Sequence, residues 1–412
     1  PRAISREPTR RLGPRGAGGV CSGDLVAFDV ETFLQTRALP PVRLVFRPSA
    51  TQALESVGIS KDAVLAAITD TVIGRLQRFD YDPDAGWSTT EIPLPGSGRV
   101  GIAFADSREA AVFLRYQDFL TPVSLLSFDT QTNDVSRLKG LPPKFNTDGL
   151  TVEQLFAESA DGTRVPYFLV RRADIPLDGT TPTLLYGYGG FQVSMGPSYS
   201  AVLGRNWLEQ GGAYAVANIR GGGEFGPAWH QAGLKLNRQR IFDDFIAVGE
   251  HLIASGVTRP RHLGIIGGSN GGLLMGVMMN QRPELWNAVV VQVPLLDMLR
   301  YHLLLAGASW VAEYGSPDVP EERAFLESIS PYHRFDPSKP SPIPFFVTST
   351  KDDRVHPAHA RKMAIRFEEA GLPFYYFETI DGGHAAAADP VARAKRSALE
   401  YTYLVRQLFP AF

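Results

Sequence analysis

The stretch HLGIIGGSNGGLLMGVMMN, residues 262–280, decides the fold. In it an apolar run leads into Gly267-Gly268-Ser269-Asn270-Gly271, and an apolar helical pattern follows. A G-x-S-x-G sequence between a strand and a helix is the context in which a sharp turn holds a nucleophilic serine above a sheet. We therefore predict that Ser269 is a nucleophile. The alternative is an ordinary glycine-rich turn that happens to contain a serine.

Strand and helix patterns alternate on both sides of this motif, over residues 151–412. The apolar runs include TLLYGY, AYAVANI, AVVVQV, FFVTST and FYYFET, and the helical patterns include FDDFIAVGEHLIAS and HARKMAIRFEEAG. Near the start, VEQLFAES and VPYFLVRR flank the turn signal Asp161-Gly162 and predict a hairpin. This alternation predicts a mostly parallel, doubly wound sheet with helices on both faces, and together with the Ser269 motif it indicates an α/β-hydrolase domain. Ligands bind such sheets at the carboxyl ends of the strands.

A serine nucleophile needs a general base, and this architecture places an acidic residue and then a histidine after the serine. Asp352 follows FFVTST, 83 residues after Ser269, and His384 follows FYYFET, a further 32 residues along. The two glycines directly before His384 let its loop fold so that the imidazole reaches across the sheet. We predict that His384 is the base and that Asp352 orients it, with Asp353 as the competing carboxylate.

The oxyanion hole requires a second hydrogen-bond donor besides the backbone N–H of Asn270. The stretch LLYGYGGF, residues 184–191, ends a strand and offers the phenol of Tyr188. The alternative is that Tyr188 is a core residue beside the glycines of a turn.

An H-x-x-H pattern, His356 and His359, stands at the start of a predicted helix. No third ligand accompanies it, so we interpret both residues as solvated loop histidines rather than metal ligands. Neither a metal nor an organic cofactor is expected.

Residues 20–130 show short strand-like runs and no long helix. Phe-Asp pairs followed by turn residues begin at Phe28, Phe79 and Phe128, which are 51 and 49 residues apart. A repeat of ~50 residues in an all-β region is typical of one propeller blade. The alternative is coincidence, because aspartate is common where strands turn. We predict a partial β-propeller of about three blades over residues 1–150.

Composition and charge narrow the class of protein. The 412 residues carry 41 basic and 43 acidic side chains, a net charge of −2, which gives no sign of binding to nucleic acid or to a membrane. Cys21 is the single cysteine, so no internal disulfide forms. No apolar run approaches the ~20 residues of a membrane span, and the first residues lack the apolar core of a secretory signal. We expect a cytoplasmic location, and we leave a periplasmic or secreted one open because the chain does not begin with Met.

Taken together, several segments resemble the prolyl oligopeptidase family of serine peptidases. YGYGGF, NIRGGGEFG, GGSNGG, NQRPELW, LDMLRYH, DDRV and the GGH loop stand in the family's order, and the resemblance covers residues 151–412 almost throughout. Asn270, directly after the nucleophile, resembles the prolyl group of the family rather than its oligopeptidase B, acylaminoacyl peptidase or dipeptidyl peptidase groups. The resemblance implies an α/β-hydrolase domain preceded by a β-propeller that screens substrates by size.

The resemblance also implies roles for individual residues. It makes Ser269, Asp352 and His384 a catalytic triad, with Tyr188 and the Asn270 N–H as the oxyanion hole. For substrate binding it implies Phe191, Trp310 and Tyr314 as an apolar pocket for proline, Leu295 and Val355 as further walls, and Arg354 as the anchor of a substrate carbonyl. From the residues alone, the alternative is that Trp310 and Tyr314 are core aromatics at positions i and i+4 of a helix.

The implied function is hydrolysis of the peptide bond on the carboxyl side of proline in oligopeptides. The alternatives are a broader esterase or aminopeptidase with the same triad, and an inactive, truncated scaffold. Two departures from the family affect the pocket and its loop: Pro294, where many members have Gly, and the sequence GGHAAAAD after the last strand. The early propeller blades are also missing from this sequence, and open sheet edges favour self-association.

Overall fold

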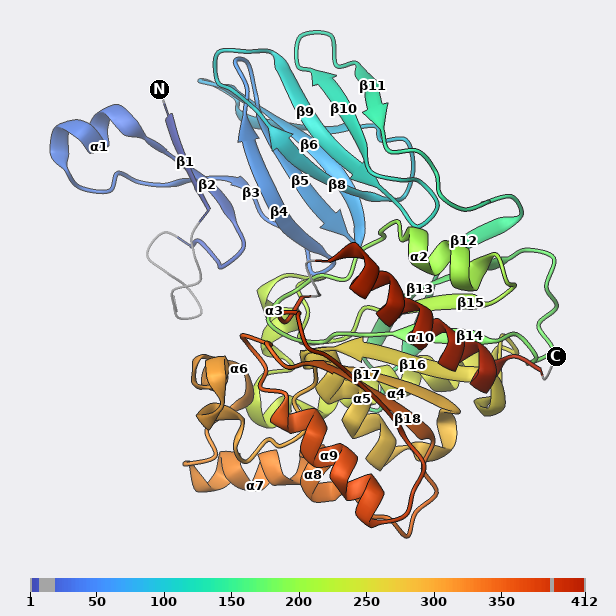
Figure 1. Ribbon diagram of the computed structural model, residues 1–412. Coiled ribbons are helices and arrows are strands. Elements are labelled where there is room, and N and C mark those ends of the chain that lie inside the picture. Colours follow the sequence, from blue (N-terminus) through green and yellow to red (C-terminus); the bar gives the residue numbers. More distant parts are fainter. Residues whose placement is uncertain (1, 7–18, 386–388, 411–412) are drawn as a thin grey trace. The chain divides into compact units, whose positions relative to one another are not determined.

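The computed structural model describes residues 2–6, 19–385 and 389–410, which form two compact units (Figure 1). The first unit holds the residues up to 143 together with 196–200 and 223–229, and the second holds the remaining ones. All the site residues that the sequence predicts belong to the second unit.

Antiparallel sheets make up the first unit. One three-stranded sheet has the order β1-β2-β3, and two four-stranded sheets have the orders β4-β5-β6-β7 and β8-β9-β10-β11. Their strands are β1 (Arg2–Arg6), β2 (Leu25–Asp29), β3 (Arg43–Phe46), β4 (Gln52–Ile59), β5 (Val64–Asp70), β6 (Ile73–Asp82), β7 (Gly86–Ile92), β8 (Arg99–Phe104), β9 (Ala111–Gln117), β10 (Ser124–Asp129) and β11 (Val135–Gly140), with a short helix α1 (Val30–Thr36) after β2.

The Phe-Asp repeat falls on equivalent strands of the two four-stranded sheets. Phe79 lies in β6 and Phe128 in β10, each the third strand of its sheet, and both side chains are fully buried. Phe28 lies in β2 of the three-stranded sheet and is half-buried. A four-stranded antiparallel sheet is the size of one propeller blade. The number of blades and the boundary at residue 150 stay predictions.

An eight-stranded sheet forms the second unit, in the order β12-β13-β15-β14-β16-β17-β18-β19. The strands are β12 (Leu150–Glu158), β13 (Arg164–Arg172), β14 (Thr183–Tyr186), β15 (Ala213–Ala217), β16 (Leu263–Gly268), β17 (Ala288–Gln292), β18 (Ile343–Ser349) and β19 (Tyr375–Thr379). β12 and β13 pair as the predicted antiparallel hairpin, β13 pairs antiparallel with β15, and all later neighbours are parallel. The prediction of a mostly parallel sheet is therefore confirmed.

Long helices cover both faces of this sheet: α4 (Gln239–Ala254), α5 (Asn270–Gln281), α9 (Ala358–Glu369) and α10 (Pro390–Leu408). Apolar side chains of α4, α5 and α9 join those of β16 and β17 in one buried cluster. α10 also contacts β16 and β17, but its buried Tyr403 and Leu404 lie outside that cluster. α10 therefore packs on the opposite face from α4 and α5, as Figure 1 shows.

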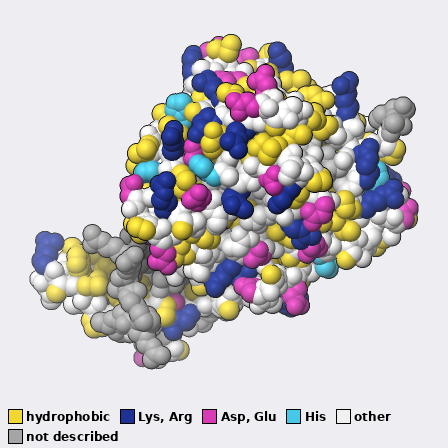
Figure 2. Space-filling model, turned by 90° about the horizontal axis from the view of Figure 1, so that it is seen from below, with side chains coloured by type: hydrophobic (Ala, Val, Ile, Leu, Met, Phe, Trp, Pro, Cys, Tyr) yellow, Lys and Arg dark blue, Asp and Glu magenta, His cyan; other side chains and the backbone are white. Residues whose placement is uncertain are grey.

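Shorter helical segments fill the connections. They are α2 (Ala201–Leu203), the π-helical η1 (Gly204–Leu208), α3 (Pro227–Gln231), η2 (Lys235–Asn237), η3 (Pro260–His262), η4 (Pro283–Leu285), η5 (Tyr301–Leu303), η6 (Leu305–Trp310), α6 (Val311–Tyr314), α7 (Pro320–Ile329) and α8 (Pro331–Arg334). Among the helices of the described residues, none combines the length and the apolar character needed to cross a membrane. On the face in Figure 2, acidic and basic side chains are interspersed, so this face presents no broad field of one sign.

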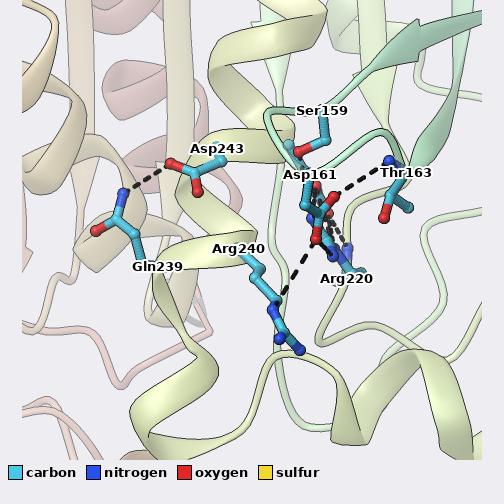
Figure 3. Close-up of polar contacts among 8 residues, drawn as sticks. Ser159, Asp161, Thr163, Arg220, Gln239, Arg240 and Asp243 are labelled. Carbon is cyan, nitrogen blue, oxygen red and sulfur yellow. Dashed lines mark hydrogen bonds and ion pairs between the residues drawn. The ribbon is translucent and has the colours of Figure 1, made fainter.

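A buried ion cluster fixes the loop after β15 (Figure 3). The Arg220 side chain, 5% exposed, donates from Nε to Asp244 of α4 at 2.9 Å and from Nη2 to Asp161 of the hairpin turn at 3.1 Å. Its backbone N–H also donates to Asp244, at 3.0 Å. The hydrogen bond from Arg220 holds the pKa of the Asp161 carboxyl well below its usual range. The cluster thus joins the β12–β13 turn, the loop after β15 and α4.

Candidate active site

Ser269 occupies the sharp turn between β16, which ends at Gly268, and α5, which begins at Asn270. Its backbone has φ 58° and ψ −116°, in the left-handed region that non-glycine residues rarely adopt. A Cβ atom at Gly267 would lie 2.6 Å from the Gly271 carbonyl oxygen, and one at Gly271 would lie 2.8 Å from the Gly187 carbonyl oxygen. Both outer glycines of the motif are therefore required for the strand and helix to approach this closely.

His384 and Asp352 meet across the carboxyl ends of β18 and β19. The His384 Nδ1 atom lies 2.8 Å and 3.0 Å from the two carboxylate oxygens of Asp352, whose side chain is fully buried. The Asp353 carboxylate instead accepts the backbone N–H of His384, at 3.2 Å. Of the two competing carboxylates, Asp352 is the one that faces the imidazole.

Backbone groups hold the Asp352 carboxylate in place. Its Oδ1 atom accepts the N–H groups of Arg354 and Val355, each at 2.9 Å. With the imidazole, these donors satisfy a buried charge that would otherwise be costly. Val355 is itself buried and is not among the residues that line the cavity described next, so its contact with the site is this N–H.

A cavity of about 200 Å³ lies in front of Ser269. Its lining combines the predicted nucleophile, the predicted base and most of the residues that the family resemblance assigns to substrate binding. The lining residues are Tyr188, Phe191, Ser269, Leu295, Trp310, Tyr314, Arg354 and His384.

Aromatic rings form one wall of this cavity. The Phe191 ring meets the Tyr314 ring edge-on, with centroids 5.6 Å apart, and the Trp310 ring likewise at 6.4 Å. Trp310 ends η6 and is half-buried, whereas Tyr314 lies in α6 and is 1% exposed. The two residues thus do not share one regular helix, and Tyr314 is both a core residue and a cavity wall.

Tyr188 stands beside the serine. Burial together with the nearby Glu313 charge raises the pKa of Tyr188, and the neighbouring Ser269 hydroxyl offsets only part of this rise. The phenol therefore keeps its proton and can donate it in a hydrogen bond. The side chain of Asn270 is occupied elsewhere: its amide donates to the Tyr188 carbonyl at 2.5 Å, and its Oδ1 accepts the Tyr314 hydroxyl at 3.0 Å.

Sequence reasoning missed a buried polar network behind the aromatic wall. Glu313, 5% exposed, contacts Arg238 at 3.3 Å and His230 at 2.7 Å. The Arg238 side chain is 1% exposed, and its guanidinium lies over the Tyr314 ring at 4.4 Å from the centroid and also binds the Asn270 Oδ1 atom. A glutamate inside the apolar segment ASWVAEYG was the available signal, because buried carboxylates are rare unless they are paired.

The interpretation of the H-x-x-H pair as solvated histidines is wrong for His359. His359 is only 2% exposed on α9, and its Nδ1 atom accepts the backbone N–H groups of Leu296 and Asp297, at 3.3 Å and 3.1 Å. Helix α9 begins at Ala358, one residue before the start of the predicted pattern at His359, and the His359 side chain is buried in the helix rather than solvated in a loop. Among the described residues, no group of three histidine, cysteine or acidic side chains could hold a metal ion.

His359 is expected to make stability depend on pH. Burial, with smaller contributions from the charges of Lys362 and His356, lowers the pKa of His359 from 6.5 to about 4. The unfolded chain therefore binds a proton more readily than the folded one, and the free energy of unfolding should fall as pH drops from about 6.5 to about 4. A pKa shift of this size corresponds to a loss of about 3 kcal/mol in the free energy of unfolding. His359→Asn keeps an acceptor but cannot be protonated, so urea unfolding at several pH values should give a flatter profile.

The control for this prediction is the half-buried His356, whose Nδ1 accepts the nearby Ala358 N–H at 3.0 Å. His356→Asn removes an imidazole from the same segment without removing the acceptor of Leu296 and Asp297. An equal flattening in both variants would contradict a specific role for His359.

Comparison with known proteins gives matches to peptidases, in sequence and in structure. The model of the prolyl oligopeptidase family matches residues 198–410. An uncharacterized peptidase, y4nA, of Sinorhizobium fredii is 53% identical over 387 residues, which are 94% of this chain and 53% of that protein. A post-proline cleaving enzyme from Rickettsia typhi has a similar structure, with a TM-score of 0.88 and 34% identity, over 95% of this chain and 57% of that one.

A prolyl oligopeptidase B from Galerina marginata, bound to a 35-residue hydrolysis and macrocyclization substrate, also has a similar structure. Its TM-score is 0.85 and its identity 28%, over 93% of this chain and 54% of that one. The chain thus spans about half the length of the relatives it matches. These matches confirm the predicted fold class, in which a partial β-propeller precedes an α/β-hydrolase domain.

Proposed function

The chain belongs to the prolyl oligopeptidase family, and on that premise we propose that it is a serine peptidase that cleaves oligopeptides on the carboxyl side of proline. The observation that carries the proposal is the cavity: Ser269 and His384 line it together with the aromatic rings of Phe191, Trp310 and Tyr314. A nucleophile and a base that share a cavity with an apolar wall suit an apolar acyl group.

In the proposed reaction, the Ser269 Oγ attacks the carbonyl carbon of proline while His384 Nε2 takes the hydroxyl proton. Asp352 accepts the Nδ1–H, which fixes the tautomer and stabilises the imidazolium. The Tyr188 hydroxyl and the Asn270 backbone N–H donate to the oxyanion. His384 then gives its proton to the leaving amine as the C–N bond breaks. Water then attacks the acyl carbonyl carbon while His384 takes its proton. His384 returns this proton to the Ser269 Oγ as the ester C–O bond breaks, which releases the acid product.

The pocket supports a preference for proline over polar acyl groups. The pyrrolidine ring is rigid and presents only apolar faces, which the edges and faces of aromatic rings can contact closely. Leu295 is 1% exposed beside the same cavity and adds an aliphatic wall. Arg354 is exposed at the cavity and is our candidate for binding a substrate carbonyl, because its guanidinium donates several hydrogen bonds. We propose that Val355 contributes to the site by donating its backbone N–H to Asp352, and not as a wall of the substrate pocket.

Trp310→Ala tests the pocket. If the indole stacks on the proline ring, the variant should raise KM for a Gly-Pro arylamide about fivefold, which corresponds to ~1 kcal/mol of ring contact. KM for an acetyl aryl ester should change much less, because the acetyl group does not reach the ring. Steady-state kinetics on both substrates measures this difference.

The control for Trp310→Ala is Leu303→Ala, which shortens a side chain that is 72% exposed in the preceding turn. Equal effects of Trp310→Ala on both substrates would show that Trp310 acts only in the core.

One experiment tests the function as a whole. The purified 412-residue chain is treated with an active-site serine phosphonate and assayed with a Gly-Pro arylamide, an alanyl arylamide and a simple ester. We expect labelling and a preference for the prolyl amide. Labelling with turnover of the other substrates alone would indicate a broader esterase or aminopeptidase, and absence of labelling would indicate an inactive scaffold.

Two further parts of the proposal concern the whole chain. We propose that residues 1–150 are the propeller portion and residues 151–412 the catalytic domain. Self-association is proposed through open sheet edges of the first unit, where β11 is an edge strand with mostly exposed side chains.

A further inference from the structure

The turn that carries Tyr188 and Phe191 has an unfavourable backbone. Phe191 and Gln192 have φ values of 55° and 57°, so two successive non-glycine residues lie in the left-handed region. Such a conformation persists only where surrounding groups hold it. The groups that hold this turn therefore control where the Phe191 ring stands in the cavity wall.

Hydrogen bonds from outside the turn hold it at four points, and the longest of them runs from Arg238 Nη2 to the Gly189 carbonyl, at 3.5 Å. The Tyr188 carbonyl accepts the Asn270 amide, and the Gln192 N–H donates to the Gly221 carbonyl at 3.1 Å. Gly221 follows Arg220 in the loop that the buried ion cluster fixes. The Phe191 N–H donates to Oε1 of Glu313 at 3.0 Å. Among these four contacts of the described residues, Glu313 supplies the only carboxylate acceptor.

Glu313 connects the two halves of the aromatic wall. Phe191 comes from the turn after β14, whereas Trp310 and Tyr314 come from η6 and α6, more than a hundred residues later. Glu313 precedes Tyr314 on α6 and reaches back to the Phe191 backbone. The bond thus fixes the turn against the helix at the point where their rings meet edge-on.

The carboxylate of Glu313 is kept charged and oriented by its partners. Its Oε2 atom contacts His230 Nε2 at 2.7 Å, and its Oε1 atom contacts Arg238 Nη1 at 3.3 Å. Burial by itself raises the pKa of Glu313, but the hydrogen bond with His230 and the charge of Arg238 outweigh it, so the pKa lies below its usual value. An ionised acceptor binds an N–H more strongly than a neutral one.

We propose that Glu313 is a positioning residue for acyl-group specificity: by holding the Phe191 N–H, it sets the shape of the aromatic pocket. Glu313 does not line the cavity, so it acts through Phe191. The inference rests on the proposed function insofar as the pocket takes the ring of proline.

A pair of double variants tests this role. Removing Glu313 alone would leave Arg238 buried without its partner, which unfolds many proteins. Arg238→Met with Glu313→Leu removes both charges and the acceptor. Arg238→Met with Glu313→Gln also removes both charges but keeps an oxygen that can accept the Phe191 N–H. Any effect of losing Arg238 is common to both, so their difference reports the polar contacts of residue 313, to the Phe191 N–H and to His230.

The readout is the ratio of kcat/KM for a Gly-Pro arylamide to that for an acetyl aryl ester. We expect this ratio to be about tenfold lower in the Leu variant than in the Gln variant, mainly through KM of the prolyl amide. Glu322→Gln is the matched control, because Glu322 also accepts a backbone N–H, from Ser316 at 2.6 Å, and pairs with Lys235 at 2.8 Å. Its ratio should equal that of the wild type.

The outcomes separate the two proposals. Equal ratios in the two double variants, with both folded by circular dichroism, would overturn the positioning role whatever the substrate preference. If the wild-type chain prefers a different acyl group, the proposed function fails. The same two variants, assayed with the preferred acyl group against acetyl, then still decide whether Glu313 positions the pocket.

Discussion

Ser269→Ala is expected to abolish turnover of peptide and ester substrates and to abolish phosphonate labelling. Loss of a nucleophile in a serine triad typically costs ~10⁴-fold or more in kcat, because its partners act only through it. The fold should survive, since alanine differs from serine only by the hydroxyl and meets the same backbone constraint at φ 58°. Steady-state kinetics and thermal unfolding of the variant check both expectations.

The control for this substitution is Ser328→Ala on α7. Ser328 is exposed, and its hydroxyl donates only to the Phe325 carbonyl, at 2.7 Å, among the contacts of the described residues. The Ser328→Ala substitution should leave turnover and labelling unchanged. Residual activity above a tenth of wild type in Ser269→Ala, after removal of any wild-type contamination, would exclude Ser269 as the nucleophile.

Asp352→Asn is expected to lower kcat by about 10⁴-fold without unfolding the protein. The amide oxygen can still accept the N–H groups of Arg354 and Val355, so the amide nitrogen turns toward His384 Nδ1. That nitrogen donates where the carboxylate accepts. The imidazole must then keep its proton on Nε2, and it can no longer take the proton of Ser269.

Asp353→Asn is the matched control for this prediction. Its carboxylate accepts only the backbone N–H of His384 among the contacts given above, and an amide oxygen can do the same. We expect a loss of no more than a few-fold in kcat. A larger loss for Asp353→Asn than for Asp352→Asn would reverse the assignment of the orienting carboxylate.

The sequence by itself determined the parts of this protein that depend on local pattern. The alternation of apolar runs and helical patterns specified the sheet and its covering helices, because strands and helices bury their side chains with different periods. The hairpin followed from Asp161-Gly162, where glycine adopts a φ of 80°. Ser269 followed from its glycines, since a Cβ at Gly267 would meet the Gly271 carbonyl oxygen within the turn itself. The residues from 386 to 388, in the loop after His384, lie outside the described part of the chain.

Only the tertiary structure decided the matters that depend on contacts between distant segments. Asp352 and Asp353 are neighbours of the same type, and a loop 32 residues later selects between them. His359 has an ordinary helical position in the sequence, yet two backbone N–H groups more than sixty residues away require its neutral ring. Glu313 meets Phe191 across 122 residues, a pairing that no periodicity encodes. Hydrogen bonds act over about 3 Å, and which groups come within that distance is set by how the elements pack rather than by where they stand in the chain.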